Sequence, residues 1–223
     1  MAAGGDGRSS VTRVDGRSGA SVSQPLARGR HTIVRVSDDG NVLVRIESQS
    51  AAPASTVVFN GSAAPTIEVV DAIAWSPASQ AVAATGEPEN DRNCSTVHNT
   101  SRGRPLLQRQ CDWHPVDFSP DGRWIYAIAS YTDGPSTSSA AILDAATGEV
   151  ARELGFVQSD VFAGGFIDQA WESQDALVLQ VESAGKTALL RLDVVAGSAE
   201  LTTPALDYAG VVSTGSPSPY ALG

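Results

Sequence analysis

The sequence is poor in the patterns that build helices, membrane spans and export signals. No stretch repeats apolar residues with the 3.6-residue period of an amphipathic helix. No apolar run approaches the roughly 20 residues that a membrane-spanning helix needs, and residues 1–30 contain no apolar core of a secretion signal. We therefore expect an all-β protein that does not insert directly into a membrane.

Charge is scarce, and one sign prevails. Charged residues make up 18% of the 223 residues, and 25 acidic residues outnumber 15 basic ones, which gives a formal net charge of -10. Binding to a nucleic-acid backbone depends on basic patches, so we expect no nucleic-acid partner. An acidic surface of this kind serves solubility in the simplest interpretation.

Signatures of catalysis, cofactor binding and metal binding are also missing. The three histidines, His31, His98 and His114, are not spaced like metal ligands. No Gly-x-Ser-x-Gly or Gly-x-Gly-x-x-Gly element occurs, and acidic turns such as those at Asp121 and Asp133 do not match a calcium loop. We expect no catalytic residues, no metal and no cofactor.

What the chain does contain is a repeated unit of a turn followed by a strand. Its clearest copy is Phe-Ser-Pro-Asp-Gly-Arg-Trp-Ile-Tyr over residues 118–126. Pro and Gly set the turn there, and aromatic and β-branched residues favour the strand that follows. Related copies begin at Trp75 and Trp171. A second landmark, Leu-Asp followed by three residues and Gly, occupies residues 143–148 and 192–197.

A period of about 40–50 residues that holds about four strands is typical of a β-propeller blade. We predict a β-propeller or partial propeller built of four-stranded antiparallel blades, at about residues 70–111, 112–156 and 166–206, with one or more partial blades in residues 31–70. Residues 1–30 have few apolar side chains and are predicted to form a flexible arm. A β-sandwich is the alternative fold, but it does not require two landmarks to recur in the same order.

The two cysteines predict a disulfide bond. Cys94 and Cys111 lie on either side of residues 99–105, which have the composition of a hairpin turn. We therefore expect the cysteines to face each other on antiparallel strands, within the distance that a disulfide spans. Two free buried thiols are the alternative. A disulfide implies an oxidising compartment, such as the cell envelope or the extracellular space.

In their order along the chain, these landmarks resemble those of a known family. They are Cys94, Cys111, residues 118–123, residues 143–150, Trp171, residues 191–193 and residues 218–222. From about residue 70 to its end, the chain resembles the C-terminal part of WD40-like or TolB-like β-propeller proteins of actinobacteria. The Gly-His and Trp-Asp dipeptides of true WD40 repeats do not occur. The resemblance implies an extracytoplasmic propeller, usually with an N-terminal membrane anchor and mostly without an assigned activity.

Aromatic residues divide into two groups by their position in the repeat. Those at repeated positions or at the start of a strand are expected to pack in the core between blades. They are Trp75, Phe118, Trp124 and Trp171. Trp113 lies outside this register, and Tyr131 and Asp133 belong to a long loop between strands. Because long loops often carry function, we predict that these three face a ligand.

Together these expectations favour a non-enzymatic binding or scaffolding module outside the cytoplasm. Its partner would be a protein, a peptide or a glycan. The alternative is a hydrolase or lyase on the same scaffold, which needs two carboxylates within roughly 5–10 Å of each other. Its candidate carboxylates are Asp121, Asp133, Asp160 and Glu172.

Overall fold

The chain folds into β-strands. The computed structural model describes residues 10–26, 30–36, 42–47, 54–58, 72–76, 78–79, 81–86, 89–90, 92–99, 105–131, 134–156, 164–183, 186–201, 211–213 and 220–221. Strands are the only regular secondary structure in these residues, which confirms the predicted all-β class. No helix in this part of the chain is long and apolar enough to cross a bilayer.

Three four-stranded antiparallel sheets follow one another along the chain. The cysteine blade holds β6 (Ala72–Ser76), β7 (Ala81–Thr85), β8 (Ser95–Asn99) and β9 (Pro105–Gln110). The central blade holds β10 (Trp113–Phe118), β11 (Trp124–Tyr131), β12 (Gly134–Asp144) and β13 (Val150–Phe156). The leucine blade holds β14 (Gly164–Trp171), β15 (Ala176–Ser183), β16 (Lys186–Asp193) and β17 (Ser198–Leu201). The predicted units were about residues 70–111, 112–156 and 166–206.

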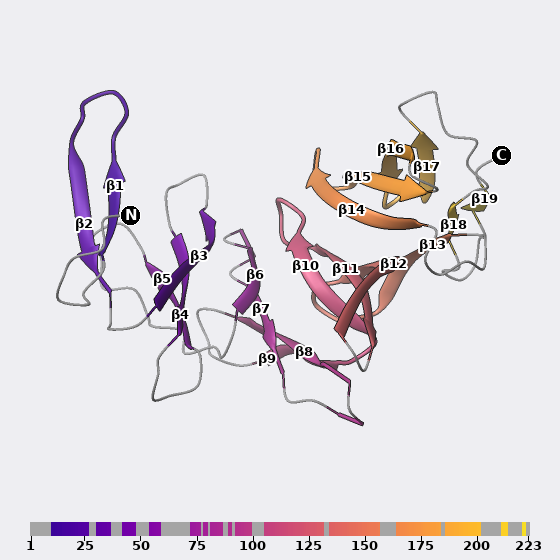
Figure 1. The fold of residues 1–223 in the computed structure, drawn as a ribbon, viewed down its shortest axis with the longest axis horizontal. Coiled ribbons are helices and arrows are strands. Elements are labelled where there is room, and N and C mark those ends of the chain that lie inside the picture. The colour runs from indigo at the N-terminus through magenta and orange to yellow at the C-terminus, as the bar shows by residue number, and fades with distance from the viewer. Residues whose placement is uncertain are drawn as a thin grey trace.

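Two smaller sheets precede these blades. One is the hairpin of β1 (Ser10–Val14) and β2 (Ser21–Pro25), and the other is the three-stranded sheet of β3 (Arg30–Val36), β4 (Val42–Glu47) and β5 (Ala54–Val58). Residues 59–71, where part of a partial blade was predicted, lie outside the described residues. Figure 1 shows the sheets arranged side by side in sequence order, with β1 and β2 at one end of the molecule and β14–β19 at the other.

The central blade carries two additional strands. β18 (Val211–Ser213) pairs with the outer strand β13, and β19 (Tyr220–Ala221) pairs with β18, so the sheet has the order β10-β11-β12-β13-β18-β19. The whole leucine blade lies between β13 and β18 in the sequence. The C-terminal strands therefore join the central blade, although the leucine blade directly precedes them in the sequence (Figure 1).

The Ser-Pro-Asp-Gly element forms the turn that the sequence predicted. The Ser119 hydroxyl accepts a hydrogen bond from the Trp124 backbone N–H (2.9 Å) and donates one to the Asp121 carboxylate (2.7 Å). Gly122 has a φ of 75°, which residues with a side chain rarely adopt. The turn is held by its own side chains, and for that reason it was recognisable from the sequence.

The Leu-Asp landmark also forms one recurrent turn. In the turn from β12 to β13, the Asp144 carboxylate accepts hydrogen bonds from two backbone N–H groups, and Gly148 has a φ of 75°. In the turn from β16 to β17, Asp193 accepts one, and Gly197 has a φ of 69°. The N–H of each glycine donates to the backbone oxygen of its aspartate.

The N-terminal hairpin corrects the prediction of an arm without structure over residues 1–30. Asp15 accepts bonds from two backbone N–H groups, and the Gly19 N–H donates to the Asp15 backbone oxygen at a φ of 71°. This is the same turn as in the two blades, preceded by Val14 in place of Leu. The prediction failed there because it weighed only the low apolar content. A turn capped by its own aspartate joins two short strands into a hairpin without a large core.

The first strand of the three-stranded sheet and the first strand of each of the three blades contain a β-bulge. The pairing register shifts between Ile33 and Arg35 in β3 and between Ala72 and Ala74 in β6. It shifts between Pro115 and Asp117 in β10 and between Phe166 and Asp168 in β14. The residues skipped by the pairing are Val34, Ile73, Val116 and Ile167. A bulge exchanges the faces of the residues that follow it, so it decides which side chains enter the core.

Two buried clusters of the described residues form seams between blades, and a smaller one, Val42 and Val44 with Val11 and Leu26 against them, lies in the N-terminal sheets. The cysteine seam joins the cysteine blade to the central blade and contains Ala74, Ala81, Ala83, Val97, Trp113, Phe118, Ile125, Ala127, Ala129, Ala141, Leu143 and Ala145. The leucine seam joins the central blade to the leucine blade. It contains Trp124, Tyr126, Ala140, Ile142, Leu154, Phe166, Leu177, Leu179, Val181, Ala188, Leu190, Leu192 and Val194. The central blade is therefore apolar on both faces.

Candidate binding surface at the disulfide-linked seam

The predicted disulfide is present. Cys94 and Cys111 are bonded, with their Cα atoms 4.0 Å apart. Their position differs slightly from the expectation, because Cys94 directly precedes β8 and Cys111 directly follows β9, so neither lies within a strand. The last ladder pair next to them is Ser95 with Gln110. The bond thus closes the open end of the hairpin.

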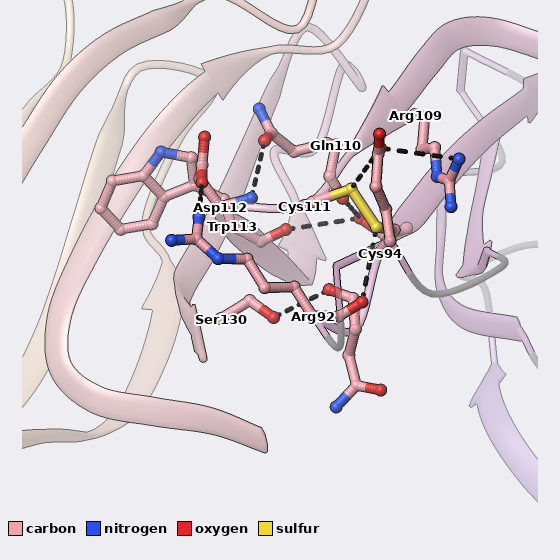
Figure 2. The surroundings of a disulfide bond; sticks show 11 residues. Arg92, Cys94, Arg109, Gln110, Cys111, Asp112, Trp113 and Ser130 are labelled. Carbon is pink, nitrogen blue, oxygen red and sulfur yellow. Dashed lines mark hydrogen bonds and ion pairs between the residues drawn. A yellow bond between two sulfur atoms is a disulfide. The ribbon is translucent and has the colours of Figure 1, made fainter. Parts of the chain in front are cut away.

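The disulfide ties two connections together at the edge of the cysteine seam (Figure 2). Cys94 ends the connection from β7 to β8, and Cys111 begins the connection from the cysteine blade to the central blade. In the first connection, Glu89 and Arg92 form a two-way backbone bridge, and Asn90 has a φ of 49°. Asn tolerates this left-handed conformation better than most residues do, so the tight turn is locally favoured.

Hydrogen bonds hold the same connections against the central blade. The Ser130 hydroxyl donates to the Asn93 backbone oxygen (2.9 Å), and the Ser130 N–H donates to the Asp112 backbone oxygen (2.9 Å). The Ser95 hydroxyl, which is buried, lies 3.4 Å from the Trp113 backbone oxygen. A backbone group that is buried at a packed edge without a hydrogen-bond partner destabilises the fold. These bonds supply the partners, and they fix both connections in place.

Two ion pairs lie on the exposed side of the disulfide (Figure 2). Arg92 pairs with Asp112, and Arg109 pairs with Glu89 at 3.5 Å. All four side chains are between 38% and 67% exposed, so solvent screens both pairs and they add little to stability. They present two cations and two anions on a surface whose backbone is held by the disulfide.

The sulfur atoms do not form a metal site in this state. Ligand atoms of Glu89, Cys94 and Cys111 lie within 4.8 Å of one another, and the Cys111 sulfur is 3.7 Å from the Glu89 carboxylate. Bonded sulfurs carry no proton to donate and no thiolate to bind a metal. The cluster is therefore a disulfide beside a carboxylate, and the carboxylate pairs with Arg109.

The structure separates the three residues predicted to face a ligand. Tyr131, at the end of β11, is 46% exposed and directly follows Ser130, whose N–H is bonded to Asp112. Trp113 is only 9% exposed and packs in the cysteine seam, so its predicted position at the surface was wrong. Asp133 lies outside the described residues. We name the exposed group Glu89, Arg92, Arg109, Asp112 and Tyr131 the clasp surface.

The bulge in β10 explains the burial of Trp113. Strict alternation would place Trp113 and Phe118 on opposite faces of the strand, because they are five positions apart. The register shift at Val116 exchanges the faces, so both side chains point into the cysteine seam. No residue type in this segment predicts a bulge, so the bulge could not be recognised from the sequence.

The residues predicted to pack between blades occupy buried or half-buried positions. Trp75 is 2% exposed, Phe118 is 1% exposed and Trp124 is 7% exposed. Trp171 is half-buried and packs against the leucine seam. The indole N–H of Trp124 donates to the Asp175 carboxylate across that seam (2.9 Å), and the Arg123 guanidinium lies 4.4 Å from the Trp124 ring centre.

Two titratable groups have shifted pKa values for reasons of burial. Burial lowers the pKa of His98, whose Nε2 lies 2.7 Å from the Thr96 hydroxyl. Burial raises the pKa of the Tyr126 phenol, and the Asp168 carboxylate raises it further. Both shifts favour the neutral form of the side chain at pH 7.

The carboxylates considered for catalysis have structural roles where the structure describes them. Asp121 accepts hydrogen bonds from the Ser119 hydroxyl and the Arg123 N–H inside its own turn. Glu172 pairs with Arg191 at 2.6 Å. Asp133 and Asp160 lie outside the described residues. The two described carboxylates belong to turns of different blades and are each engaged locally.

Comparison with known proteins identifies the fold. No protein-family model and no curated protein matches the chain. It is similar to the structure of the Dos1 propeller, with a TM-score of 0.54 and 11% identity over 93% of this chain and 60% of that one. It is also similar to the β-propeller domain of the Trilobed protease from Pyrococcus furiosus, which has an open velcro topology. That match has a TM-score of 0.50 and 13% identity over 86% of this chain and 71% of that one.

A third match is BamB from Moraxella catarrhalis, with a TM-score of 0.39 and 8% identity over 76% of this chain and 66% of that one. The first two likenesses establish the predicted β-propeller fold and nothing more specific. The chain spans 60% of the length of the Dos1 propeller that it matches.

Proposed function

We propose that this chain is a non-enzymatic binding module that acts outside the cytoplasm and uses the clasp surface to hold a protein, peptide or glycan. The observation that carries this proposal is the disulfide between Cys94 and Cys111, which ties together two connections that carry exposed charged side chains and are bonded to Ser130, next to the exposed Tyr131. A rigid loop on a rigid scaffold loses little entropy on binding, and this favours affinity.

The chemistry of the clasp surface suits polar recognition. Arg92, Arg109, Glu89 and Asp112 offer donors and acceptors of both signs, and Tyr131 offers an exposed ring with a hydroxyl. Tyr and Arg are the residue types that most often dominate binding energy at interfaces. Aromatic faces and paired charges together fit a peptide or a glycan better than they fit an apolar ligand.

The disulfide also supports the proposed compartment. Structural disulfides persist in oxidising surroundings and are rare where thiols are kept reduced. Trapping of free thiols with a maleimide in intact cells, followed by gel-shift analysis, tests this point. We expect Cys94 and Cys111 to be unreactive until a reductant is added, and labelling without reduction would contradict an oxidising location.

A binding experiment tests the function itself. The oxidised, immobilised chain is exposed to a cell-envelope extract and to a glycan array, and saturation is measured for every retained species. We expect a saturable partner whose affinity falls about tenfold or more in Tyr131→Ala and in Arg92→Ala, as for interface hot spots. The matched control is Val195→Ala, which alters a 58% exposed side chain in a turn of the leucine blade.

Comparing the affinities of the variants shows whether the partner binds at the clasp surface or elsewhere on the molecule. Equal losses in the control and in the two clasp variants would place binding elsewhere and refute the proposed surface. Absence of any saturable partner would refute the binding function. The alternative of a hydrolase or lyase gains no support from the described residues, because Asp121 and Glu172 are engaged in their own turns.

A further inference from the structure

Two sulfur atoms and a carboxylate meet at the open end of the hairpin formed by β8 and β9. Ligand atoms of Glu89, Cys94 and Cys111 all lie within 4.8 Å of one another, and the Glu89 carboxylate is 3.7 Å from the Cys111 sulfur. In a tetrahedral zinc site, with Zn–S of about 2.3 Å and Zn–O of about 2.1 Å, a sulfur ligand and an oxygen ligand lie roughly 3.6 Å apart. The carboxylate is therefore already placed as a co-ligand of the Cys111 sulfur would be.

Contacts other than the S–S bond hold both cysteines in place. Ser95, which follows Cys94, pairs with Gln110, which precedes Cys111. The Ser95 hydroxyl lies 3.4 Å from the Gln110 backbone oxygen, and the Ser130 hydroxyl donates to the backbone oxygen of the residue before Cys94 (2.9 Å). Because these contacts use only backbone and hydroxyl groups, they survive loss of the S–S bond. Rotation of the two cysteine side chains then parts the sulfurs to the roughly 3.8 Å that separates two sulfur ligands of one tetrahedral ion.

The turn that carries the carboxylate is also held by its backbone. Glu89 and Arg92 each donate an N–H to the backbone oxygen of the other, at 3.0 and 2.9 Å. The Glu89 side chain is 53% exposed and pairs with Arg109 at 3.5 Å. A carboxylate has two oxygens, so Glu89 can bind a metal ion through one of them and keep the guanidinium on the other. Ligating carboxylates commonly have such a second partner, which orients them.

The charges around the cluster suit a divalent cation of borderline softness. Two thiolates and one carboxylate carry three negative charges, so a bound divalent ion leaves one, and the Arg109 guanidinium beside Glu89 balances it. Thiolate sulfur favours ions such as Zn²⁺, whereas Mg²⁺ and Ca²⁺ prefer oxygen ligands. Three protein ligands leave the fourth tetrahedral position to water, which reaches the site because Glu89 is exposed.

We infer that reduction converts the disulfide into a site for a divalent ion such as Zn²⁺, with Cys94 and Cys111 as thiolate ligands and Glu89 as the carboxylate ligand. A dithiol supplies the two electrons and two protons that split the S–S bond, and it is itself oxidised to a disulfide. The metal ion then displaces one proton from each cysteine thiol. The inference concerns the reduced chain, whereas the proposed binding function concerns the oxidised chain, so either can fail without the other.

Cobalt binding by the reduced chain tests this site. The full chain is reduced with a phosphine in the absence of oxygen, the phosphine is removed, and Co²⁺ is added as a spectroscopic probe of the zinc site. Thiolate ligands give Co²⁺ a charge-transfer band in the near ultraviolet, and tetrahedral coordination gives it intense visible bands. We expect both sets of bands to saturate at one ion per chain, to bleach when Zn²⁺ is added, and to be absent from the oxidised chain.

Two carboxylate variants distinguish a ligand from a nearby charge. Glu89→Gln replaces the carboxylate by an amide, which is a weaker ligand, and should weaken Co²⁺ binding at least tenfold. Asp112→Asn is the matched control, since Asp112 directly follows Cys111, has a 67% exposed side chain and pairs with Arg92. It should change the affinity for Co²⁺ less than twofold. Equal losses in the two variants would mean that negative charge near the sulfurs holds the ion without ligation by Glu89, and would overturn the inference.

Unfolding of the reduced chain gives a second measurement that needs no cobalt. A metal ion that binds the folded chain more tightly than the unfolded one raises the urea midpoint. We expect Zn²⁺ to raise the midpoint of the reduced parent chain and of reduced Asp112→Asn, and to raise that of reduced Glu89→Gln much less. A reduced parent chain without cobalt bands, an oxidised chain that binds Co²⁺ as tightly as the reduced one, or a midpoint that Zn²⁺ leaves unchanged would each overturn the inference.

Discussion

The two seams join blades of one architecture in different ways. In the cysteine seam, the cysteine blade contributes only small side chains: Ala74, Ala81, Ala83 and Val97. In the leucine seam, the leucine blade contributes mostly large ones: Phe166, Leu177, Leu179, Val181, Ala188, Leu190, Leu192 and Val194. In the cysteine seam, small side chains of one blade therefore meet larger ones of the central blade, such as Trp113 and Phe118, whereas in the leucine seam both blades contribute large side chains.

Backbone groups take part in hydrogen bonds across the cysteine seam. Ser130 bonds to the backbone of Asn93 and of Asp112, and a disulfide closes the nearby hairpin. Across the leucine seam, the described polar links begin at long side chains, from Trp124 to Asp175 and from Arg152 to a backbone oxygen. The comparison indicates that small residues at a blade interface are compensated by polar and covalent links, whereas leucines need few of them.

The largest expected effect belongs to the leucine seam. Leu190 is fully buried, so Leu190→Ala removes packed volume and leaves a cavity. We expect the free energy of unfolding to fall by about 3 kcal/mol, within the range for such changes. Urea denaturation measures it. Leu189→Ala, on the neighbouring residue that is 40% exposed, is the matched control and should cost less than about 1 kcal/mol. Equal losses would show that the seam is not tightly packed.

At the cysteine seam, the disulfide is expected to stabilise the fold by a similar amount. Replacing both cysteines, Cys94→Ala with Cys111→Ala, frees the unfolded chain from a covalent loop. For a separation of 17 residues, we expect a loss of about 3 kcal/mol in the free energy of unfolding, the value of loop-closure estimates. Denaturation of the parent chain with and without reductant should give the same difference. An unchanged midpoint on reduction would contradict this expectation.

Close packing at the cysteine seam predicts a smaller effect at one glycine. A Cβ on Gly122 would overlap the hydroxyl groups of Ser79 and Ser76, and the φ of Gly122 is 75°. Gly122→Ala should therefore cost about 2–3 kcal/mol, since backbone strain of roughly 1–2 kcal/mol is added to a steric clash.

Gly19 provides the matched control for this prediction. Its φ is 71°, but a Cβ there would meet nothing within 4 Å. Gly19→Ala should cost only the backbone strain, about 1 kcal/mol. Thermal denaturation of both variants measures the difference. Losses of the same size would mean that the turn at Gly122 can move away from the cysteine blade, and that this seam is looser than its geometry indicates.

The sequence predicted those parts of the fold that depend on local chemistry. Ser-Pro-Asp-Gly and Leu-Asp-x-x-x-Gly bond to their own backbone, so the turns and the strands between them follow from neighbouring residues. The disulfide was predicted because it spans one hairpin. The same turn at Asp15 was missed because Val precedes it and apolar residues around it are few.

Features that depend on distant residues were not predictable in this way. The bulge at Val116 places Trp113 in the core, and only pairing with β11 reveals it. The bond from Trp124 to Asp175 joins residues 51 positions apart, and the ion pair of Arg92 with Asp112 requires the packed seam. The clasp surface was therefore only partly foreseen, through Tyr131.

A single hydrogen bond tests the polar contribution to the leucine seam. Asp175→Ala leaves the partly buried indole N–H of Trp124 without its acceptor. We expect a loss of about 1.5–2 kcal/mol in the free energy of unfolding, at the low end of the range for hydrogen bonds to charged groups. Glu172→Ala breaks an exposed ion pair with Arg191 in the same turn and should cost less than about 1 kcal/mol. If both variants cost the same, the bond to Trp124 contributes nothing beyond an exposed pair.

The smallest effect is a pH dependence in the cysteine blade. Burial holds the pKa of His98 below its ordinary value of 6.5, so the unfolded chain takes up this proton more readily than the folded one. Stability then falls as the pH drops below about 6.5 towards the folded pKa, and this contribution is constant above it. Denaturation midpoints of the parent chain and of His98→Gln, measured from pH 7.5 to 5, should converge as the pH falls. Parallel curves would mean that His98 is protonated equally in both states, and that this part of the cysteine blade is open to solvent.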